Sequence, residues 1–252
     1  MLLLSPLEQF QILPLIPIRF GDLDISFSNG NLVTLTLIFI LTFFIHLLLS
    51  SRASFYIVPS RWQVMIEITY ETIENMLYDN LGDHGKQFFP FIFVLFTFVL
   101  FSNIAGLIPY SFTNTSHLIV TFTLAFAIFI GINIICVKTH GIHMISLFLP
   151  SGTSLGLALL LVPLELISYM FKPISLGVRL FANMMAGHTL LKVIAGFAYS
   201  MLMSGSLLVV AHVIPIFILI LLVGLELGVA VIQAYVFTIL TCIYLNDAIN
   251  LH

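Results

Sequence analysis

The chain has 252 residues, of which 60% are hydrophobic and 8% are charged, and its mean hydropathy is +1.17. A soluble domain carries about 25% charged residues, so this composition excludes a water-soluble fold and indicates an integral membrane protein. The formal charge of −3 excludes the basic surface that nucleic-acid binding requires. The two cysteines lie in apolar runs without a repeated spacing, which indicates neither a disulfide framework nor a cysteine metal site, and we expect no cofactor.

Three apolar stretches have the length of a membrane-crossing helix, which needs about 20 residues for a hydrocarbon core about 30 Å thick. They are residues 32–49, 88–108 and 117–137. Acidic residues precede the first stretch and basic residues follow it. By the positive-inside rule, the N-terminus therefore faces outward and residues 52–86 face the cytoplasm or the matrix.

Residues 60–80 are predicted to form an amphipathic surface helix between the first two spans. Ser60 and Gln63 have the spacing of a capping box, in which each side chain hydrogen-bonds the backbone amide of the other residue. Apolar residues then recur at helical spacing, and three glutamates share the opposite face. The helix is expected on the membrane surface or against partner subunits, and a solvated connecting helix is the alternative.

The last hundred residues contain two apolar segments that are too long for upright spans, residues 154–203 and 207–247. At about 1.5 Å per residue, the second would be about 60 Å long, twice the hydrocarbon thickness. Tilting relieves such excess length, so we predict a strongly tilted hairpin that turns near residues 204–206. Four short upright spans are the alternative, but the sequence has no polar loop between Leu207 and Leu245 to separate two of them. The predicted fold class is an all-α polytopic membrane protein, a single membrane domain with about five membrane helices and one amphipathic surface helix.

Polar groups inside the two long helices are candidates for function, because a charge at the bilayer centre costs from about 3 to more than 10 kcal/mol. On the second helix, Glu226 and Gln233 are seven residues apart and share a face. On the first helix, about 100° per residue puts four polar side chains in one stripe. These four are Glu165, Lys172, Arg179 and Asn183.

The residue numbers also predict which groups meet across the hairpin. In an antiparallel pair of straight helices, residues at one level have position numbers with a constant sum. Arg179 with Gln233 gives 412, and His188 with Glu226 gives 414, and both sums centre the turn at 206 or 207. We therefore expect Arg179 beside Gln233, and His188 near Glu226 about two turns away.

The chemistry of these groups points to an ion pathway. A guanidinium does not deprotonate in proteins, so Arg179 can act only as a fixed positive charge. Such a charge blocks proton leakage and stabilises a carboxylate opposite it. Few acids of this chain are available for that position, which implies a carboxylate from another subunit. Glu226 and His188 titrate and can relay protons through water.

Each residue also has an interpretation without transport. Arg179 can be neutralised by an acid of its own chain, His188 can be a hydrogen-bonded core histidine, and Glu226 can be protonated and inert. Lys172 and Lys192 are expected to extend to the membrane surface rather than to act in a pathway.

Two segments of the predicted hairpin carry a family resemblance. They are residues 176–188, Leu-Gly-Val-Arg-Leu-Phe-Ala-Asn-Met-Met-Ala-Gly-His, and residues 224–233, Gly-Leu-Glu-Leu-Gly-Val-Ala-Val-Ile-Gln. Both resemble subunit a of the F-type ATP synthase, also called subunit 6, and the resemblance runs nearly end to end. His188 stands where many bacterial members have glutamate, and Glu226 where they have histidine. This exchanged pair is similar to the mitochondrial and alphaproteobacterial form.

The resemblance implies a proton-translocating subunit of the ATP synthase membrane sector. In that family, two offset aqueous half-channels lead protons to and from the ring of c subunits, and an arginine separates them. Arg179 would be this separator, with Gln233 and Asn183 as polar neighbours. Glu226 and His188 would line the half-channel from the intermembrane space. Toward the matrix exit, the implied pathway residue is Glu165.

Partners, location and catalytic status follow from the same resemblance. The expected partners are the c-ring subunits, subunit b of the peripheral stalk, small membrane subunits of the ATP synthase, and lipid. The implied location is the mitochondrial inner membrane, with an alphaproteobacterial plasma membrane as the alternative. The subunit would be non-catalytic on its own, and the chain lacks a G-x-x-x-x-G-K-[ST] phosphate loop.

Two other classes of protein compete with this interpretation. A self-contained proton-coupled transporter or antiporter-like subunit usually has internal repeats, and the sequence has no such repeat. A structural assembly subunit would not need an arginine in hydrocarbon.

Overall fold

The structure is a computed structural model that describes residues 8–21, 23–50, 61–108, 111–141, 155–203 and 212–250. The chain divides into two compact units. Unit 1 comprises Met1–Phe55, Thr97–His117 and Phe181–Ala234. Unit 2 comprises Tyr56–Phe96, Leu118–Leu180 and Tyr235–His252.

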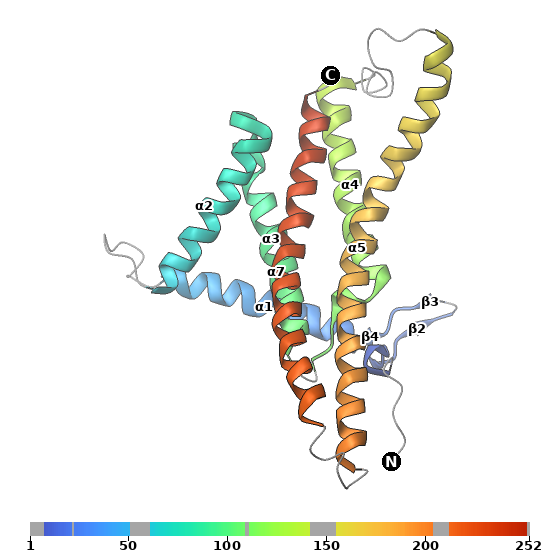
Figure 1. The fold of residues 1–252 in the computed structure, drawn as a ribbon. Coiled ribbons are helices and arrows are strands. Elements are labelled where there is room, and N and C mark those ends of the chain that lie inside the picture. Colours follow the sequence, from blue (N-terminus) through green and yellow to red (C-terminus); the bar gives the residue numbers. More distant parts are fainter. Residues whose placement is uncertain are drawn as a thin grey trace. The chain divides into compact units, whose positions relative to one another are not determined.

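Helices dominate both units (Figure 1). Their bounds are α1 Asn29–Ser50, α2 Arg61–Leu81, α3 Phe89–Gly106, α4 Leu118–His140, α5 Leu155–Met203 and α7 Val213–Ile249. The 3-10 helices among the described residues are η1 Glu8–Phe10, η3 Gly82–Phe88 and η4 Asn114–Ser116. Residues 60 and 154, where two predicted helices begin, and residues 204–211 lie outside the described residues.

Four helical stretches in the described part of the chain are long and apolar enough to cross a membrane. They are Gly85–Gly106, Leu118–His140, Leu160–Met203 and Val213–Ile249. A shorter apolar stretch, Asn29–Phe43, belongs to α1. The prediction of an all-α polytopic membrane protein is confirmed. Prolines occur in the first turns of α3 and α7, where the missing N–H removes no bond of the helix.

Four short strands precede α1, and the sequence analysis did not predict them. In unit 1, β1 (Pro14–Ile16) pairs antiparallel with β4 (Phe27–Ser28), and β2 (Arg19–Phe20) pairs with β3 (Leu23–Asp24). The side chain of Asn29 joins this ribbon to α1. Its Oδ1 accepts from the amides of Leu13 and Gly30, and its Nδ2 donates to the carbonyl of Gln11. Asn29 therefore ties the ribbon to the first turn of α1 with one side chain.

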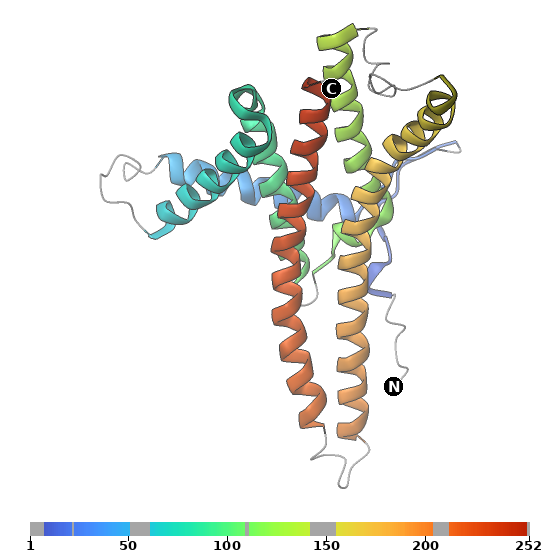
Figure 2. The same cartoon turned by 45° about the horizontal axis from the view of Figure 1, so that its top comes forward.

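In unit 1, residues 181–203 of α5 and 213–234 of α7 run antiparallel and side by side, as Figure 1 and Figure 2 both show. The predicted turn at residues 204–206 lies outside the described residues. Within the same unit, α1 runs across the direction of this helix pair. Two helices that cross at a large angle cannot both follow the membrane normal. An upright α1 would therefore go with a tilted hairpin, and the tilt stays a prediction.

In unit 2, the apolar residues of α2 are exposed in its first half and buried in its second half. Ile73, Met76 and Leu77 are at most 4% exposed and form its packed face, while Met65 and Ile68 are about 60% exposed. The exposed pair fits a helix on a membrane surface or against a partner. Of the predicted capping box, Ser60 lies outside the described residues, and the Gln63 side chain donates to Glu67 at 2.8 Å.

Also in unit 2, α5 approaches the backbone of α4 closely at Gly177. A β-carbon on Gly177 would lie 3.0 Å from the Phe122 α-carbon and 3.1 Å from the Thr121 carbonyl oxygen. Both atoms belong to the α4 backbone, which cannot move aside as a side chain can. Gly177 is therefore the residue that permits this helix contact.

Candidate functional site

Glu226 is buried in the hairpin of unit 1 and fills the space that a glycine leaves. The residue is 7% exposed, and neither carboxyl oxygen has a hydrogen-bond partner among the described residues. A β-carbon on Gly187 of α5 would lie 2.0 Å from Glu226 Oε1 and 2.8 Å from Glu226 Cδ. The carboxyl group therefore rests on the backbone of Gly187, the residue before His188.

The His188 side chain reaches the end of α3. Its Nε2 atom is buried and has no hydrogen-bond partner among the described residues. A β-carbon on Gly106 would lie 3.7 Å from His188 Nε2 and 2.1 Å from Thr113 Cγ2. The ring therefore lies close to Gly106, beside a turn in which the polar residues from Thr113 to Ser116 are each at most 6% exposed.

A cavity of about 250 Å³ lies along the same hairpin. Its lining is apolar except for Glu226 and Asn183. Asn183 Nδ2 donates to Gln233 Oε1 at 2.8 Å, and the Nε2 atom of the buried Gln233 has no partner among the described residues. The cavity thus connects an acid to a polar pair. No group of three or more His, Cys, Asp or Glu side chains in the described ranges is placed to hold a metal ion.

The hydrogen bond between Asn183 and Gln233 can be compared with the predicted register. The expected partner of Gln233 was Arg179, at a constant sum of 412. The observed partner, Asn183, is one helical turn further along α5 and gives 416, whereas the contact of Gly187 with Glu226 gives 413. The predicted sums of 412 and 414 thus lie within about one helical turn of the observed ones, and Arg179 stays a predicted neighbour of Gln233.

Asn103 of α3 is a polar residue of this region that the sequence analysis missed. It is fully buried, its Nδ2 donates to the Ala230 carbonyl at 3.3 Å, and its Oδ1 has no partner among the described residues. Ala230 lies on α7 between Glu226 and Gln233. An asparagine within an otherwise apolar span was the available signal.

Arg179 lies in the part of α5 that belongs to unit 2, and its side chain is exposed. Its neighbours Gly177 and Leu180 are buried. Among the described residues, Arg179 has no ion pair, so an acid of its own chain does not neutralise it there. Glu165, in the same unit, is partly buried, and its Oε2 has no partner among the described residues.

Lys172, which the sequence predicts to extend to the membrane surface, is partly buried and paired in unit 2. Its Nζ lies 2.9 Å from Asp247 Oδ2, 5.3 Å from the centre of the Tyr169 ring and 4.9 Å from that of Tyr244. The Tyr169 hydroxyl donates to Asn133 Oδ1. These contacts stabilise the positive charge of Lys172 and join α5 to α4 and α7.

His117 follows the polar turn and precedes the span of α4. Its ring stacks on Phe112 with the centroids 5.0 Å apart and meets the edge of Phe10 at 6.5 Å. Burial between these rings lowers the pKa of His117 below its ordinary value of 6.5. The folded state therefore favours the neutral imidazole at this position.

The sequence matches the family model described as ATP synthase A chain over residues 32–246. It is 55% identical to ATP synthase subunit a of Pylaiella littoralis over 98% of this chain and 99% of that relative. It is 51% identical to ATP synthase subunit a of Marchantia polymorpha, again over 98% of this chain and 99% of the relative. ATP synthase subunit a of the bacterium Paramagnetospirillum magneticum is 47% identical over the same shares of the two chains.

Proposed function

We propose that this chain, which belongs to the ATP synthase A chain family, carries protons to and from a ring of c subunits through two half-channels separated by Arg179. The chain is a multi-pass membrane subunit of the proton-translocating sector of ATP synthase and assembles with other subunits of that enzyme. What we propose beyond this are the two half-channels, the role of Arg179 as separator and the identity of the neighbouring subunits.

The exposed, unpaired Arg179 carries the proposal. A guanidinium inside an apolar helix is stable only beside an anion or water, because desolvating it alone costs several kcal/mol. Among the described residues no carboxylate of this chain pairs with Arg179, and its side chain is exposed. A carboxylate on a neighbouring c subunit would supply the missing charge. Each arriving carboxylate would then lose its proton before it passes the arginine.

The hairpin of unit 1 supports one of the two proton paths. Glu226 and His188 can each take and release a proton, and both present buried atoms without partners among the described residues. The cavity leads from Glu226 to Asn183, whose amide holds Gln233. We assign this path to the side of the intermembrane space. Glu165 is assigned to the matrix exit.

The proposed setting is the mitochondrial inner membrane, with an alphaproteobacterial plasma membrane as the alternative, because the relatives include a bacterial protein. The proposed neighbours are the c-ring, subunit b of the peripheral stalk and small membrane subunits. The chain would be non-catalytic on its own, with ATP made elsewhere in the complex. Family membership favours this assembled function over a self-contained transporter.

The test is Arg179→Ala in the assembled ATP synthase. Loss of the separating charge should abolish ATP synthesis driven by a proton gradient and leave assembly intact, because Arg179 has no ion pair among the described residues whose loss would destabilise the fold. Synthesis is measured in vesicles after an acid-to-base transition, with assembly checked by native electrophoresis. Lys192→Ala, on the same helix, is the matched control and should retain synthesis. Normal synthesis by Arg179→Ala would refute the separator role.

A further inference from the structure

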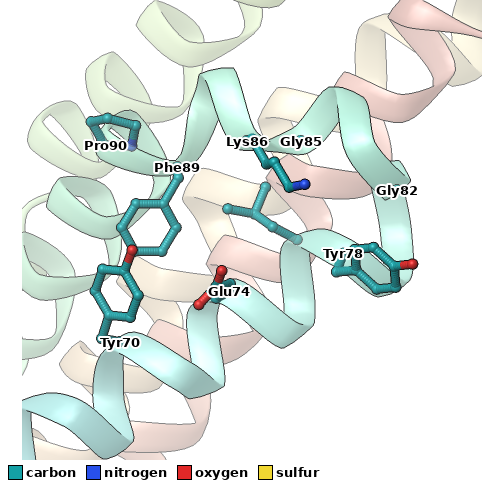
Figure 3. Close-up of a pocket in the computed structure, with 9 residues that line it drawn as sticks. Tyr70, Glu74, Tyr78, Gly82, Gly85, Lys86, Phe89 and Pro90 are labelled. Carbon is teal, nitrogen blue, oxygen red and sulfur yellow. The ribbon is translucent and has the colours of Figure 1, made fainter.

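Unit 2 contains a second cavity, at the joint where α2 passes through η3 into α3. Its volume is about 320 Å³, within the range of small-ligand sites. Figure 3 shows Tyr70, Glu74 and Tyr78 on one side, contributed by α2, with Lys86 and Phe89 facing them. The cavity therefore combines a carboxylate, an ammonium group and aromatic rings.

The position of this cavity along the chain is the boundary between polar and apolar sequence. Lys86 is the last charged residue before Lys138, so 51 consecutive residues without Asp, Glu, Lys or Arg begin directly after it. Phe89 opens α3, and its ring lies 4.4 Å from that of Tyr70. Tyrosine rings gather where hydrocarbon meets head groups. The cavity is therefore expected at the depth of lipid head groups.

The charges around the cavity distinguish between lipid classes. Between Arg61 and Phe88 the chain has five acidic residues and two basic ones. This excess disfavours a lipid that carries only negative charge. A head group with both a cation and a phosphate fits better, because Glu74 can pair with the cation and Lys86 with the phosphate. The rings of Tyr70 and Tyr78 add cation–π attraction.

Lys86 is free to change partners at small cost. Its Nζ lies 2.9 Å from Asp83 Oδ1, but the two side chains are 74% and 81% exposed. Exposed ion pairs of this kind contribute little stability, because water screens them. A phosphate in the cavity would therefore compete with Asp83 for Lys86.

A route for the acyl chains continues from the same place. Pro90 lines the cavity, and Val94, one turn further on the same face of α3, is 61% exposed. A lipid whose head occupies the cavity can lay its tails along this face. A soluble zwitterion of the same head-group chemistry would lack that contact.

We propose that the cavity between α2 and α3 binds the head group of a zwitterionic phospholipid, with Glu74 on its cation and Lys86 on its phosphate. Phosphatidylethanolamine and phosphatidylcholine share this chemistry and differ in the cation. Binding there would hold the membrane-surface helix α2 at a fixed depth relative to the start of α3. The site is independent of the proton path proposed above.

The experiment uses the assembled ATP synthase in phosphatidylcholine vesicles that contain one photoactivatable lipid. The three probes are phosphatidylethanolamine, phosphatidylcholine and phosphatidylglycerol, each with the reactive group beside the glycerol. Trypsin cuts after Arg61 and Lys86, so the peptide of residues 62–86 reports labelling of α2 and η3 by mass spectrometry. Labelling by both zwitterionic probes above phosphatidylglycerol is expected, and their ranking identifies the preferred cation.

Glu74→Gln tests the carboxylate directly. Labelling of this peptide by the zwitterionic probes should fall about two- to fivefold, the size of one partly screened ion pair, while phosphatidylglycerol labelling should not fall. Glu71→Gln, an exposed change on the same helix outside the cavity, is the matched control and should leave labelling unchanged. Equal labelling by all three probes, or equal loss in both variants, would overturn the proposal. Free phosphoethanolamine that displaces the lipid probe fully would also overturn it, since the acyl chains would then add nothing.

Discussion

Two groups of polar side chains on α5 and α7, one in each unit, differ in whether their polar atoms have partners. In unit 2, Lys172 is paired with Asp247 and enclosed by two tyrosine rings. In unit 1, Glu226 and His188 have buried polar atoms without hydrogen-bond partners among the described residues. A buried group without a partner costs about 1–3 kcal/mol, so the second arrangement lowers stability while the first adds to it. We therefore place Lys172 in a structural set and Glu226 with His188 in a functional set, and the variants below test that division.

Between these two sets, the largest effect is expected at Glu226. Glu226→Gln keeps the shape of the side chain but cannot take up a proton, so proton flux should fall at least about tenfold. Thermal stability should not fall, because the carboxyl group has no hydrogen bond to lose among the described residues. Flux is measured as ATP-driven acidification of vesicles, with Glu71→Gln on α2 as the control. Unchanged flux would place Glu226 in the structural set.

The exchange of both titratable groups sharpens that result. The double variant His188→Glu with Glu226→His should retain more flux than either single change, because it keeps one acid and one imidazole along the path. Additive losses would count against a functional link between the two residues.

A smaller effect on flux is expected from Gly187→Ala. The added methyl group would meet the Glu226 carboxyl at 2.0 Å, and a flexible side chain can move away from it. Flux should therefore fall about three- to tenfold through misplacement of the acid, with normal assembly. Gly177→Ala is the matched comparison, since its methyl group would meet the α4 backbone. That variant should lower the amount of assembled protein, and the opposite pattern would contradict both interpretations.

The ion pair of unit 2 should affect stability and not flux. A double-mutant cycle with Lys172→Met and Asp247→Asn is expected to give a coupling free energy of about 0.5–1 kcal/mol, because the Asp247 side chain is 40% exposed and water screens the pair. Thermal unfolding of the full chain in detergent measures it. The more exposed pair of Asp83 and Lys86 is the control and should show no measurable coupling. A loss of flux in the Lys172 variant at full assembly would move this residue to the functional set.

The smallest effect is a dependence of stability on pH at His117. Because burial lowers the pKa of His117 below 6.5, the unfolded chain binds a proton at this residue before the folded chain does. Stability should therefore fall as the pH is lowered through 6.5, until the folded state is protonated as well. His117→Gln should make the profile of melting temperature against pH flatter between pH 7 and 5 than in the parent chain. An identical profile in the variant would mean that other groups carry the dependence.

Much of the fold follows from the sequence, because long apolar runs have few stable conformations in a membrane. The run after Lys86 specifies α3 and α4, and the absence of polar breaks specifies the length of α7. The short strands before α1 were missed, since two- and three-residue strands have no periodicity to read. Their stability depends on the hydrogen bonds of Asn29, which is a feature of three-dimensional structure.

The candidate site was predictable in its residue types and less so in its contacts. Arg179, His188 and Glu226 stood out because ionisable groups are costly in hydrocarbon. Gly187 and Gly177 could not be identified from the sequence, because a close contact at a glycine is recognised only when the position of the neighbouring atom is known. The same holds for the Asp247 partner of Lys172, which lies 75 residues away in the chain.

The contact at Gly177 also sets the azimuth of α5 about its own axis. Arg179 is two positions after Gly177, and each position turns the helix by about 100°. The arginine therefore emerges about 200° around the helix, nearly opposite the face that touches α4. Any rotation of α5 would drive a neighbouring β-carbon into the α4 backbone. The direction in which the Arg179 guanidinium leaves the helix thus depends on the absence of a side chain at Gly177. Bulky substitutions at Gly177 would turn the positive charge to another direction without removing it.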